Sequence, residues 1–345
     1  MRVLLTGSSG YIGCVLAPML QARGHEVVGL DTGYFEGSRF SDALPELKVL
    51  NKDIRDVKAA DVAGFEAIVH LAALSNDPLG DYRPTLTEQI NSSAAIALAR
   101  LSKAGGVSRF LFASSCSNYG AAGNNFLDEN ASPCPVTPYG VSKVTVETAL
   151  RHLADSDFSP TYLRASTAYG ASPMLRFDLV INNLTAWAYT TGRIHLKSDG
   201  TAWRPVVHVE DIARAYIAAL EAPREAVHDR AFNVGSSSEN YRVVELAELV
   251  AEVVPDCRIE YAADAGPDRR CYRVDCNRIA LELHDFKPQW HARRGIEQLY
   301  DLYQRVGLTL ADFEGERFMR IAHLKRLVSD GRLNEDLRWR APAVA

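Results

Sequence analysis

The sequence of 345 residues has few cysteines, no excess of positive charge and no long hydrophobic run. The six cysteines are scattered and lack Cys-x-x-Cys spacing, so they predict reduced thiols and no metal site. A formal net charge of −5 excludes the basic field that nucleic acid or an anionic membrane would need. No apolar stretch reaches the roughly 18–20 residues that cross a bilayer. The chain starts with an apolar run too short for a signal peptide, and we therefore expect a cytoplasmic protein.

What the chain does contain is an alternation of short apolar runs and helical patterns. Residues are 47% hydrophobic and 23% charged, which is ordinary for a folded protein with a sizeable core. Alternation of this kind is typical of parallel strands joined by crossover helices, with ligands at the carboxyl ends of the strands. The pattern therefore predicts an α/β fold with a doubly wound parallel sheet (Rossmann). Strands are expected at 2–6, 26–31, 47–50, 67–73, 109–114 and 161–165, and helices from the glycine turn to residue 20, at 85–104 and at 139–154.

The alternation loosens after residue 165, which predicts a second, smaller lobe. We expect a dinucleotide-binding domain at 1–165, to which segments at about 205–235 return. A substrate-binding lobe then comprises 166–204 and 236–325, and a charged C-terminal tail covers 326–345. Within these parts, 206–209 and 231–234 resemble strands, while 211–221 and 243–253 resemble helices.

A glycine-rich turn follows the first predicted strand. Gly7, Gly10 and Gly13 end that strand and open a helix, which is the context of a dinucleotide-binding turn. Small residues let the backbone approach a diphosphate, whose charge is stabilised by the amides at the helix N-terminus. Asp31 ends the next strand, where a carboxylate accepts hydrogen bonds from a ribose 2′-hydroxyl and repels a 2′-phosphate. These residues predict NAD rather than NADP.

Tyr139 and Lys143 are four residues apart on a predicted helix, so both side chains project from one face. A tyrosine titrates near 10, and a neighbouring cation favours the phenolate. The pair therefore suggests a phenol that works as an acid and base, with a pKa lowered by Lys143.

Over roughly residues 1–300 the chain resembles the extended short-chain dehydrogenase/reductase family, specifically its nucleotide-sugar epimerases, dehydratases and reductases. In that family the tyrosine removes a sugar hydroxyl proton while hydride leaves for NAD, and the lysine binds the nicotinamide ribose. A serine completes the site, and here it is Ser115. The motifs that carry the resemblance are Thr6-Gly7-x-x-Gly10-x-x-Gly13, Asp53-Ile54, His70-Leu71-Ala72-Ala73, Ser114-Ser115 with Tyr119-Gly120, and Tyr139-x-x-x-Lys143.

The same resemblance implies further contacts with the cofactor and the substrate. Asp53 and Ile54 match the pair that contacts adenine, and an arginine such as Arg204 suits a diphosphate. The implied cofactor-binding residues are Gly7, Gly10, Tyr11, Ile12, Gly13, Asp31, Asp53, Ile54, Leu71, Ala72, Ala73 and Lys143. The implied substrate-binding residues are Ser75, Cys116, Ser117, Asn183, Arg204, Arg269 and Arg270.

The residues after Ser115 depart from the pattern of the sugar 4,6-dehydratases, which carry Asp-Glu there. This chain has Cys116-Ser117, and a thiol with a pKa near 8.5 is a poor substitute for a carboxylate base. Relatives that use a cysteine as acid and base have it one position later, which on a strand end is the other face. Two readings of Cys116 stay open, a packing residue and a proton donor.

We therefore expect an NAD-dependent epimerase that acts on a nucleoside-diphosphate sugar through a transient keto-sugar, at carbon 4. The alternatives are a dehydratase, a keto-sugar reductase, or a non-catalytic NAD-binding sensor or scaffold. The resemblance also implies a homodimer formed by the two long helices. Its candidate apolar positions, which are equally candidates for the core, are Ile96, Leu98, Leu101, Val144, Val146 and Leu150.

Overall fold

The computed structural model describes residues 1–40, 46–268 and 270–340, and its centre is a parallel sheet of seven strands. The strands follow the order β11-β7-β5-β4-β1-β2-β3, and every neighbouring pair is parallel. They are β1 (Arg2–Thr6), β2 (Glu26–Asp31), β3 (Lys48–Asn51), β4 (Ala67–His70), β5 (Arg109–Ser115), β7 (Ser159–Ala165) and β11 (Arg230–Val234). This confirms the predicted doubly wound α/β fold.

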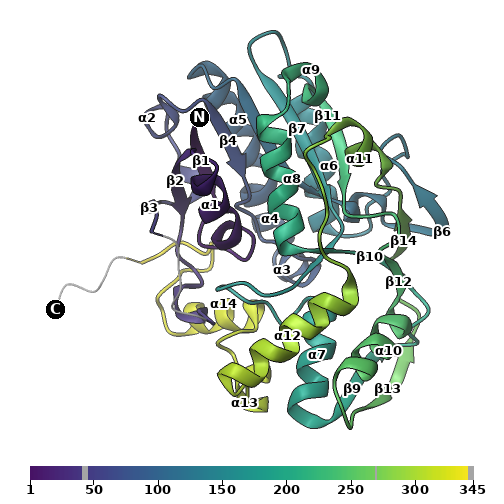
Figure 1. The fold of residues 1–345 in the computed structure, drawn as a ribbon. Helices are drawn as coiled ribbons and strands as arrows, with labels where there is room; N and C mark the ends of the chain where they lie inside the picture. The colour runs from purple at the N-terminus through teal and green to yellow at the C-terminus, as the bar shows by residue number, and fades with distance from the viewer. Residues whose placement is uncertain (41–45, 269, 341–345) are drawn as a thin grey trace.

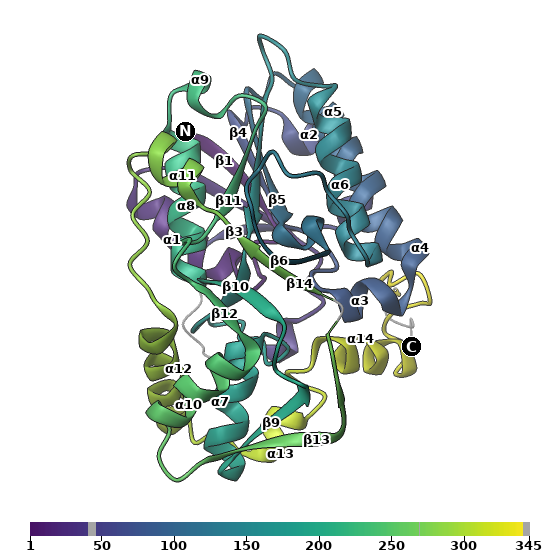
Figure 2. The same ribbon diagram turned by 90° about the vertical axis from the view of Figure 1, so that its right-hand side faces the viewer.

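Helices cover both faces of this sheet, as Figure 2 shows. One face carries α1 (Gly13–Ala22) and α8 (Val209–Glu221), and the other carries α5 (Ala94–Ala104) and α6 (Pro138–Arg151). The expected helix at 85–104 is a continuous run from α4 (Pro84–Thr87) through a π-helical turn (Glu88–Ser93) into α5. Because both faces are covered, the middle strands of the sheet are largely buried, and β4 is buried at every residue.

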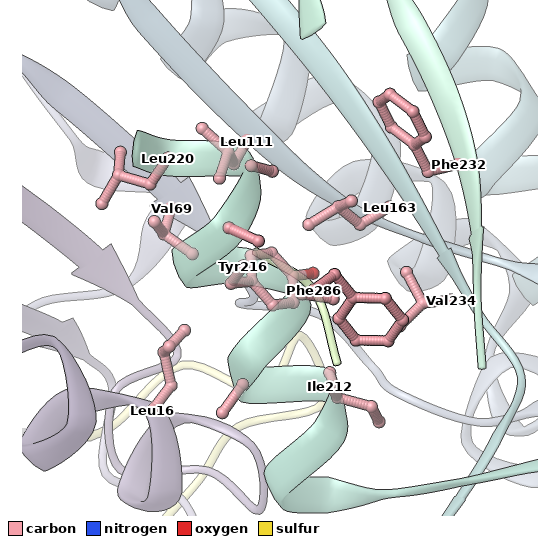
Figure 3. Packing of buried hydrophobic residues seen from close by; sticks show 14 of the residues in the cluster. Leu16, Val69, Leu111, Leu163, Ile212, Tyr216, Leu220, Phe232, Val234 and Phe286 are labelled. Atoms are coloured by element: carbon pink, nitrogen blue, oxygen red, sulfur yellow. The ribbon is translucent and has the colours of Figure 1, made fainter. Parts of the chain in front are cut away.

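The core beneath α8 shows how the sheet and the returning segment are joined. Ile212, Tyr216 and Leu220 lie one helical turn apart on α8 and pack against Leu111 and Leu163 of the sheet (Figure 3). All five side chains are buried. The segment near 205–235 therefore shares the core of the nucleotide-binding half.

A separate core lies in the second lobe (Figure 1). It is formed mainly by α7 (Val180–Thr191), α10 (Val243–Val253) and α12 (Ala292–Val306) with β9 (Arg193–Ser198). Three small sheets accompany it, made of β12 (Asn240–Arg242), β10 (Trp203–His208) and β8 (Thr167–Tyr169), of β13 (Arg258–Gly266) and β9, and of β14 (Cys271–Val274) and β6 (Ala121–Leu127). The role of this lobe in substrate binding stays a prediction.

The chain then returns to the first half, which the sequence did not indicate. After α13 (Leu310–Glu314), helix α14 (Arg320–Ser329) places Leu324 and Leu327 in the core that also contains Leu30 of β2. Leu333 and Leu337 join the same core. The described part of the predicted tail is thus packed against the nucleotide-binding half (yellow in Figure 1). Over the described residues, no helix is long and apolar enough to span a membrane.

Candidate active site

The glycine turn is built so tightly that only glycine fits. Gly7 has a φ of +71°, and a Cβ there would lie 2.8 Å from the backbone nitrogen of Ala72. A Cβ on Gly13 would lie 2.3 Å from the carbonyl oxygen of Gly7. The turn leads into α1, whose N-terminal amides favour a negative charge. This cradle fits the diphosphate of a dinucleotide.

Asp31 is the last residue of β2, beside this turn, and its side chain stabilises the conformation of the turn. Its carboxylate accepts hydrogen bonds from the backbone N–H groups of Ser9 (3.0 Å) and Gly33 (2.9 Å). Burial raises the pKa of Asp31, and these two hydrogen bonds oppose that rise. The side chain lines the cleft, in the place where a ribose hydroxyl donor is expected.

All the predicted cofactor residues of the first four strands line one cleft. Ser75, predicted to contact substrate, lines it too. The predicted members of the lining are Gly7, Gly10, Tyr11, Ile12, Gly13, Asp31, Asp53, Ile54, Leu71, Ala72, Ala73 and Ser75. The structure therefore brings together residues from four separate strand ends, and their individual contacts with the cofactor stay predictions.

The cleft is also lined by Arg176, whose segment the sequence offered for contact with the sugar without a firm role. Tyr34, Phe35 and Arg320 line it too, and they were not among the residues predicted from the sequence. The two aromatic residues follow Asp31 closely in the sequence, which was the available signal. Arg320 lies in a charged stretch that carries no motif, so nothing in the sequence distinguished it from a surface arginine.

At the adenine end, Asp53 is held by cations of the protein itself. Its carboxylate accepts hydrogen bonds from Arg55 (2.6 and 2.9 Å) and lies 3.3 Å from Arg338. Burial favours the neutral acid, but the hydrogen bonds and charge of Arg55 outweigh it and lower the pKa of Asp53.

Lys143 and Tyr139 lie on α6 as the spacing predicts. The Nζ atom of Lys143 is 5.3 Å from the centre of the Tyr139 ring and 4.9 Å from that of Phe112. Lys143 is 3% exposed, and this burial lowers its pKa to about 7. Helix α6 begins at Thr137, whose hydroxyl accepts a hydrogen bond from the backbone N–H of Gly140.

The phenol of Tyr139 titrates differently from the expectation. Burial and the nearby Asp77 raise its pKa to about 12, while Arg176 and a hydrogen bond with Ser115 oppose the rise. The expectation that Lys143 lowers this pKa is therefore wrong in this structure. The physical reason is that the phenol itself is desolvated by burial, and burial lowers the pKa of Lys143 as well.

Ser115 is the last residue of β5, beside Tyr139. Its hydroxyl oxygen accepts a hydrogen bond from the backbone N–H of Ser117 and lies 3.1 Å from the Ser117 hydroxyl. Cys116 points elsewhere, because its thiol donates to the carbonyl oxygen of Arg164 at 3.2 Å. Burial raises the pKa of Cys116 to about 12. Of the two readings, the geometry favours the packing residue.

The expected diphosphate arginines lie together at one edge of the site. Arg204 forms an ion pair with Asp268 and a hydrogen bond to the carbonyl oxygen of Arg270. Arg270 binds Asp268 (2.8 Å) and Asp77 (2.9 Å). Asp77 also accepts a hydrogen bond from Thr137 at 2.7 Å, which connects this cluster to α6. Arg269 lies outside the described residues.

Asn183 and Arg176 surround the remaining side of the substrate region. Asn183 donates to the carbonyl oxygen of Phe177 at 2.8 Å, and its contact with substrate stays a prediction. Arg176 forms a two-point ion pair with Asp178 (2.6 and 3.0 Å) and donates to the hydroxyl of Ser75 at 3.2 Å. No cluster of three or more metal-ligating side chains occurs among the residues that the structure describes.

The chain is similar to proteins of known function. The family model described as "NAD dependent epimerase/dehydratase family" matches residues 3–235. UDP-glucose 4-epimerase of Corynebacterium glutamicum is 30% identical over 269 residues, which cover 73% of this chain and 80% of that protein. UDP-glucose 4-epimerase of Bacillus subtilis is 27% identical, over 87% of this chain and 94% of that protein.

A solved structure, MoeE5 in complex with UDP-glucuronic acid and NAD, gives a TM-score of 0.76 at 26% identity. The similarity covers 88% of this chain and 99% of that one. The fold and the type of cleft are therefore those of proteins that bind NAD together with a nucleotide sugar.

Proposed function

Because the chain belongs to the NAD-dependent epimerase/dehydratase family, we propose that it inverts carbon 4 of a uridine-diphosphate sugar. The cofactor is NAD, in keeping with the family and with the glycine cradle and Asp31. The observation that carries the choice of reaction is the Ser115–Cys116–Ser117 segment. Ser115 and Tyr139 meet there, while the residue beside them is a buried thiol instead of a carboxylate.

The side chains of this site suit the movement of one proton at one oxygen. Tyr139 takes the proton from the 4-hydroxyl of the sugar, and its interaction with Ser115 lowers the pKa of the phenol and so favours the phenolate. Bound NAD supplies the acceptor for the hydride that leaves carbon 4. After the keto-sugar has turned over, the hydride returns to the opposite face of carbon 4 and Tyr139 returns the proton to the oxygen. Loss of water would need a further acid and base, and the Cys116 thiol is buried and hydrogen-bonded to the carbonyl oxygen of Arg164.

We assign the substrate diphosphate to Arg204 and Arg270. Both guanidinium groups already share one carboxylate, that of Asp268, so they converge on a point where an anion is stable. The lobe that contains Arg204 and α7 is then the substrate-binding part, as proposed from the sequence, except that α14 from residue 320 onward packs against the nucleotide-binding half.

The experiment is to incubate the purified protein with a panel of nucleotide sugars and to resolve the products by chromatography and mass. A same-mass isomer supports epimerisation. Loss of 18 mass units, as water, would instead support dehydration. Consumption of added NADH with a gain of two hydrogens would identify a reductase, and no conversion of any sugar would favour a sensor or scaffold.

We further propose a cytoplasmic homodimer. Val141 on α6 is 49% exposed, and α5 lies beside α6 on the outside of the sheet (Figure 2). Among the candidate positions, Leu98, Val146 and Leu150 are in the core and are excluded from an interface, whereas Ile96, Leu101 and Val144 are partly exposed. Light scattering after gel filtration measures the mass, and a monomer would reject the dimer.

A further inference from the structure

We propose that the C-terminal helix α14 supplies an additional cofactor-binding residue, Arg320, which contacts the diphosphate of NAD. This inference rests on the NAD-binding part of the proposed function. It adds a residue from the far end of the chain to a cleft that is lined mostly by residues 7–90.

Arg320 is the first residue of α14, and its side chain enters the cofactor cleft. It lines the same cleft as Gly10, Tyr11 and Asp31, although only 5% of the residue is exposed. The centre of its guanidinium lies 3.9 Å from the centre of the Phe35 ring, which holds it flat against the wall. A buried cation is thus positioned in the region where the glycine turn accepts an anion.

The charges around Arg320 leave room for an anionic ligand. Among the described residues, its one hydrogen bond goes to the carbonyl oxygen of Met174 at 3.4 Å, and no carboxylate lies within ion-pair distance. Arg176, the other arginine of the cleft, is already paired with Asp178. Burial and the charge of Arg176 lower the pKa of Arg320 to about 10, the charges of Asp178 and Asp31 oppose that fall, and Arg320 remains a cation at neutral pH. A buried cation without an ion pair is costly, and a diphosphate oxygen would satisfy it.

The segment around Arg320 is fastened to the nucleotide-binding half and not loosely appended. The ring of His323 lies 3.0 Å from the carbonyl oxygen of Tyr34. The Tyr34 hydroxyl donates to the carbonyl oxygen of Leu337, and the indole N–H of Trp339 donates to that of Thr32 at 2.6 Å. Arg338 forms ion pairs with Asp53 and Asp56. These contacts hold α14 at a fixed distance from β2 and therefore hold Arg320 in the cleft.

The test compares Arg320→Gln with the matched control Lys325→Gln, which removes a charge from an exposed position of the same helix. Calorimetry on cofactor-free protein measures the affinities for NAD, ADP and adenosine. Loss of a charge-assisted contact to phosphate predicts NAD and ADP binding weakened about tenfold to a hundredfold, with adenosine binding and the control unchanged. Unchanged NAD and ADP affinities, or equal losses for all three ligands, would overturn the proposal.

A second measurement on the unaltered protein covers the case in which Arg320→Gln does not fold. Amide hydrogen exchange of α14 should slow when ADP or NAD is added and stay the same with adenosine. An α14 that exchanges equally with and without ADP overturns the proposal. Neither experiment requires turnover, so an inactive protein that passes both would reject only the epimerase assignment, and an active epimerase that fails both would reject only the role of Arg320.

Discussion

Arg164 and Glu147 form a two-point ion pair, with N–O distances of 2.6 and 2.9 Å, directly behind the proposed catalytic serine. Glu147 follows Lys143 by one turn of α6, and Arg164 is on β7, so the pair ties the helix to the sheet. Asn118 donates to the same carboxylate at 3.0 Å, and Ser114 also bonds to it. The pair thereby fixes the end of β5 relative to Tyr139 and Lys143.

Removing one partner of this pair should destabilise the protein strongly. Glu147→Ala leaves the guanidinium of Arg164 buried without a counter-ion, and we expect a loss of about 3–5 kcal/mol in the free energy of unfolding. Urea denaturation followed by circular dichroism measures it. The double variant Glu147→Leu with Arg164→Met should recover much of the loss, and a single variant that loses under about 1 kcal/mol would contradict the assignment.

Tyr139→Phe should abolish turnover while leaving NAD bound. The change removes the hydroxyl that carries the proton and leaves the ring that packs beside Lys143. We expect kcat to fall at least about a hundredfold, the lower range for loss of an acid–base group. NAD content is measured by absorbance after denaturation. The control is Tyr189→Phe on α7, which should keep full activity, and near-normal kcat in Tyr139→Phe would show that the acid–base assignment is wrong.

Cys116→Ala should leave kcat unchanged, because the thiol is buried and its hydrogen bond goes to the carbonyl oxygen of Arg164. In the unaltered protein a thiol reagent should modify the exposed Cys134 first and leave Cys116 intact, as read by mass spectrometry of peptides. Rapid modification of Cys116, or a large fall in kcat in Cys116→Ala with the fold intact, would instead support the interpretation of Cys116 as a proton donor.

Arg204→Gln should raise KM for the nucleotide sugar by about tenfold to a hundredfold with a smaller change in kcat, since a diphosphate contact acts mainly on binding. Steady-state kinetics with the sugar identified by product analysis measures both constants. Arg242→Gln serves as a control, because Arg242 is exposed on β12, the strand paired with β10. An unchanged KM in Arg204→Gln would show that Arg204 does not bind the diphosphate of the substrate.

The stability of the protein should fall as the pH drops from about 6.5 toward 4. His70 is buried, 2.7 Å from the Thr6 hydroxyl and stacked on Phe112, and burial lowers its pKa to about 3. Between the two pKa values the unfolded chain binds a proton that the folded chain does not, so this stability is complete above pH 6.5 and is lost toward pH 3. The slope is about 1.4 kcal/mol per pH unit for this histidine, measured by urea unfolding at several pH values. His70→Gln should flatten the profile, and an unaltered slope in that variant would exclude His70 as its source.

Much of the fold could be predicted because its signals are local. The strand at Arg2–Thr6, the glycine turn and Asp31 are close in sequence, and each is dictated by burial or by backbone geometry. The spacing of Tyr139 and Lys143 likewise defines a helix face. The positions of these residues on their strands and helix therefore follow from short-range patterns.

What the sequence could not provide depends on contacts between distant parts of the chain. No sequence pattern near Arg320 indicates that its helix packs against the first half of the chain. The ion pairs of Arg204 and Arg270 with Asp268 likewise connect segments that are far apart in the sequence. The pKa values of Tyr139 and Lys143 depend on burial, which the i, i+4 spacing does not measure. For these residues the tertiary surroundings outweigh the local pattern.

The cleft that is lined by both Gly7 and Arg320 has a consequence for how the protein is made. The strands β1 to β5 can pair while the chain is still being synthesised, because they are close in sequence and belong to one parallel sheet. Arg320, however, cannot line the cleft until α14 has left the ribosome. A nascent chain in which α14 is not yet exposed therefore has only part of the cofactor cleft.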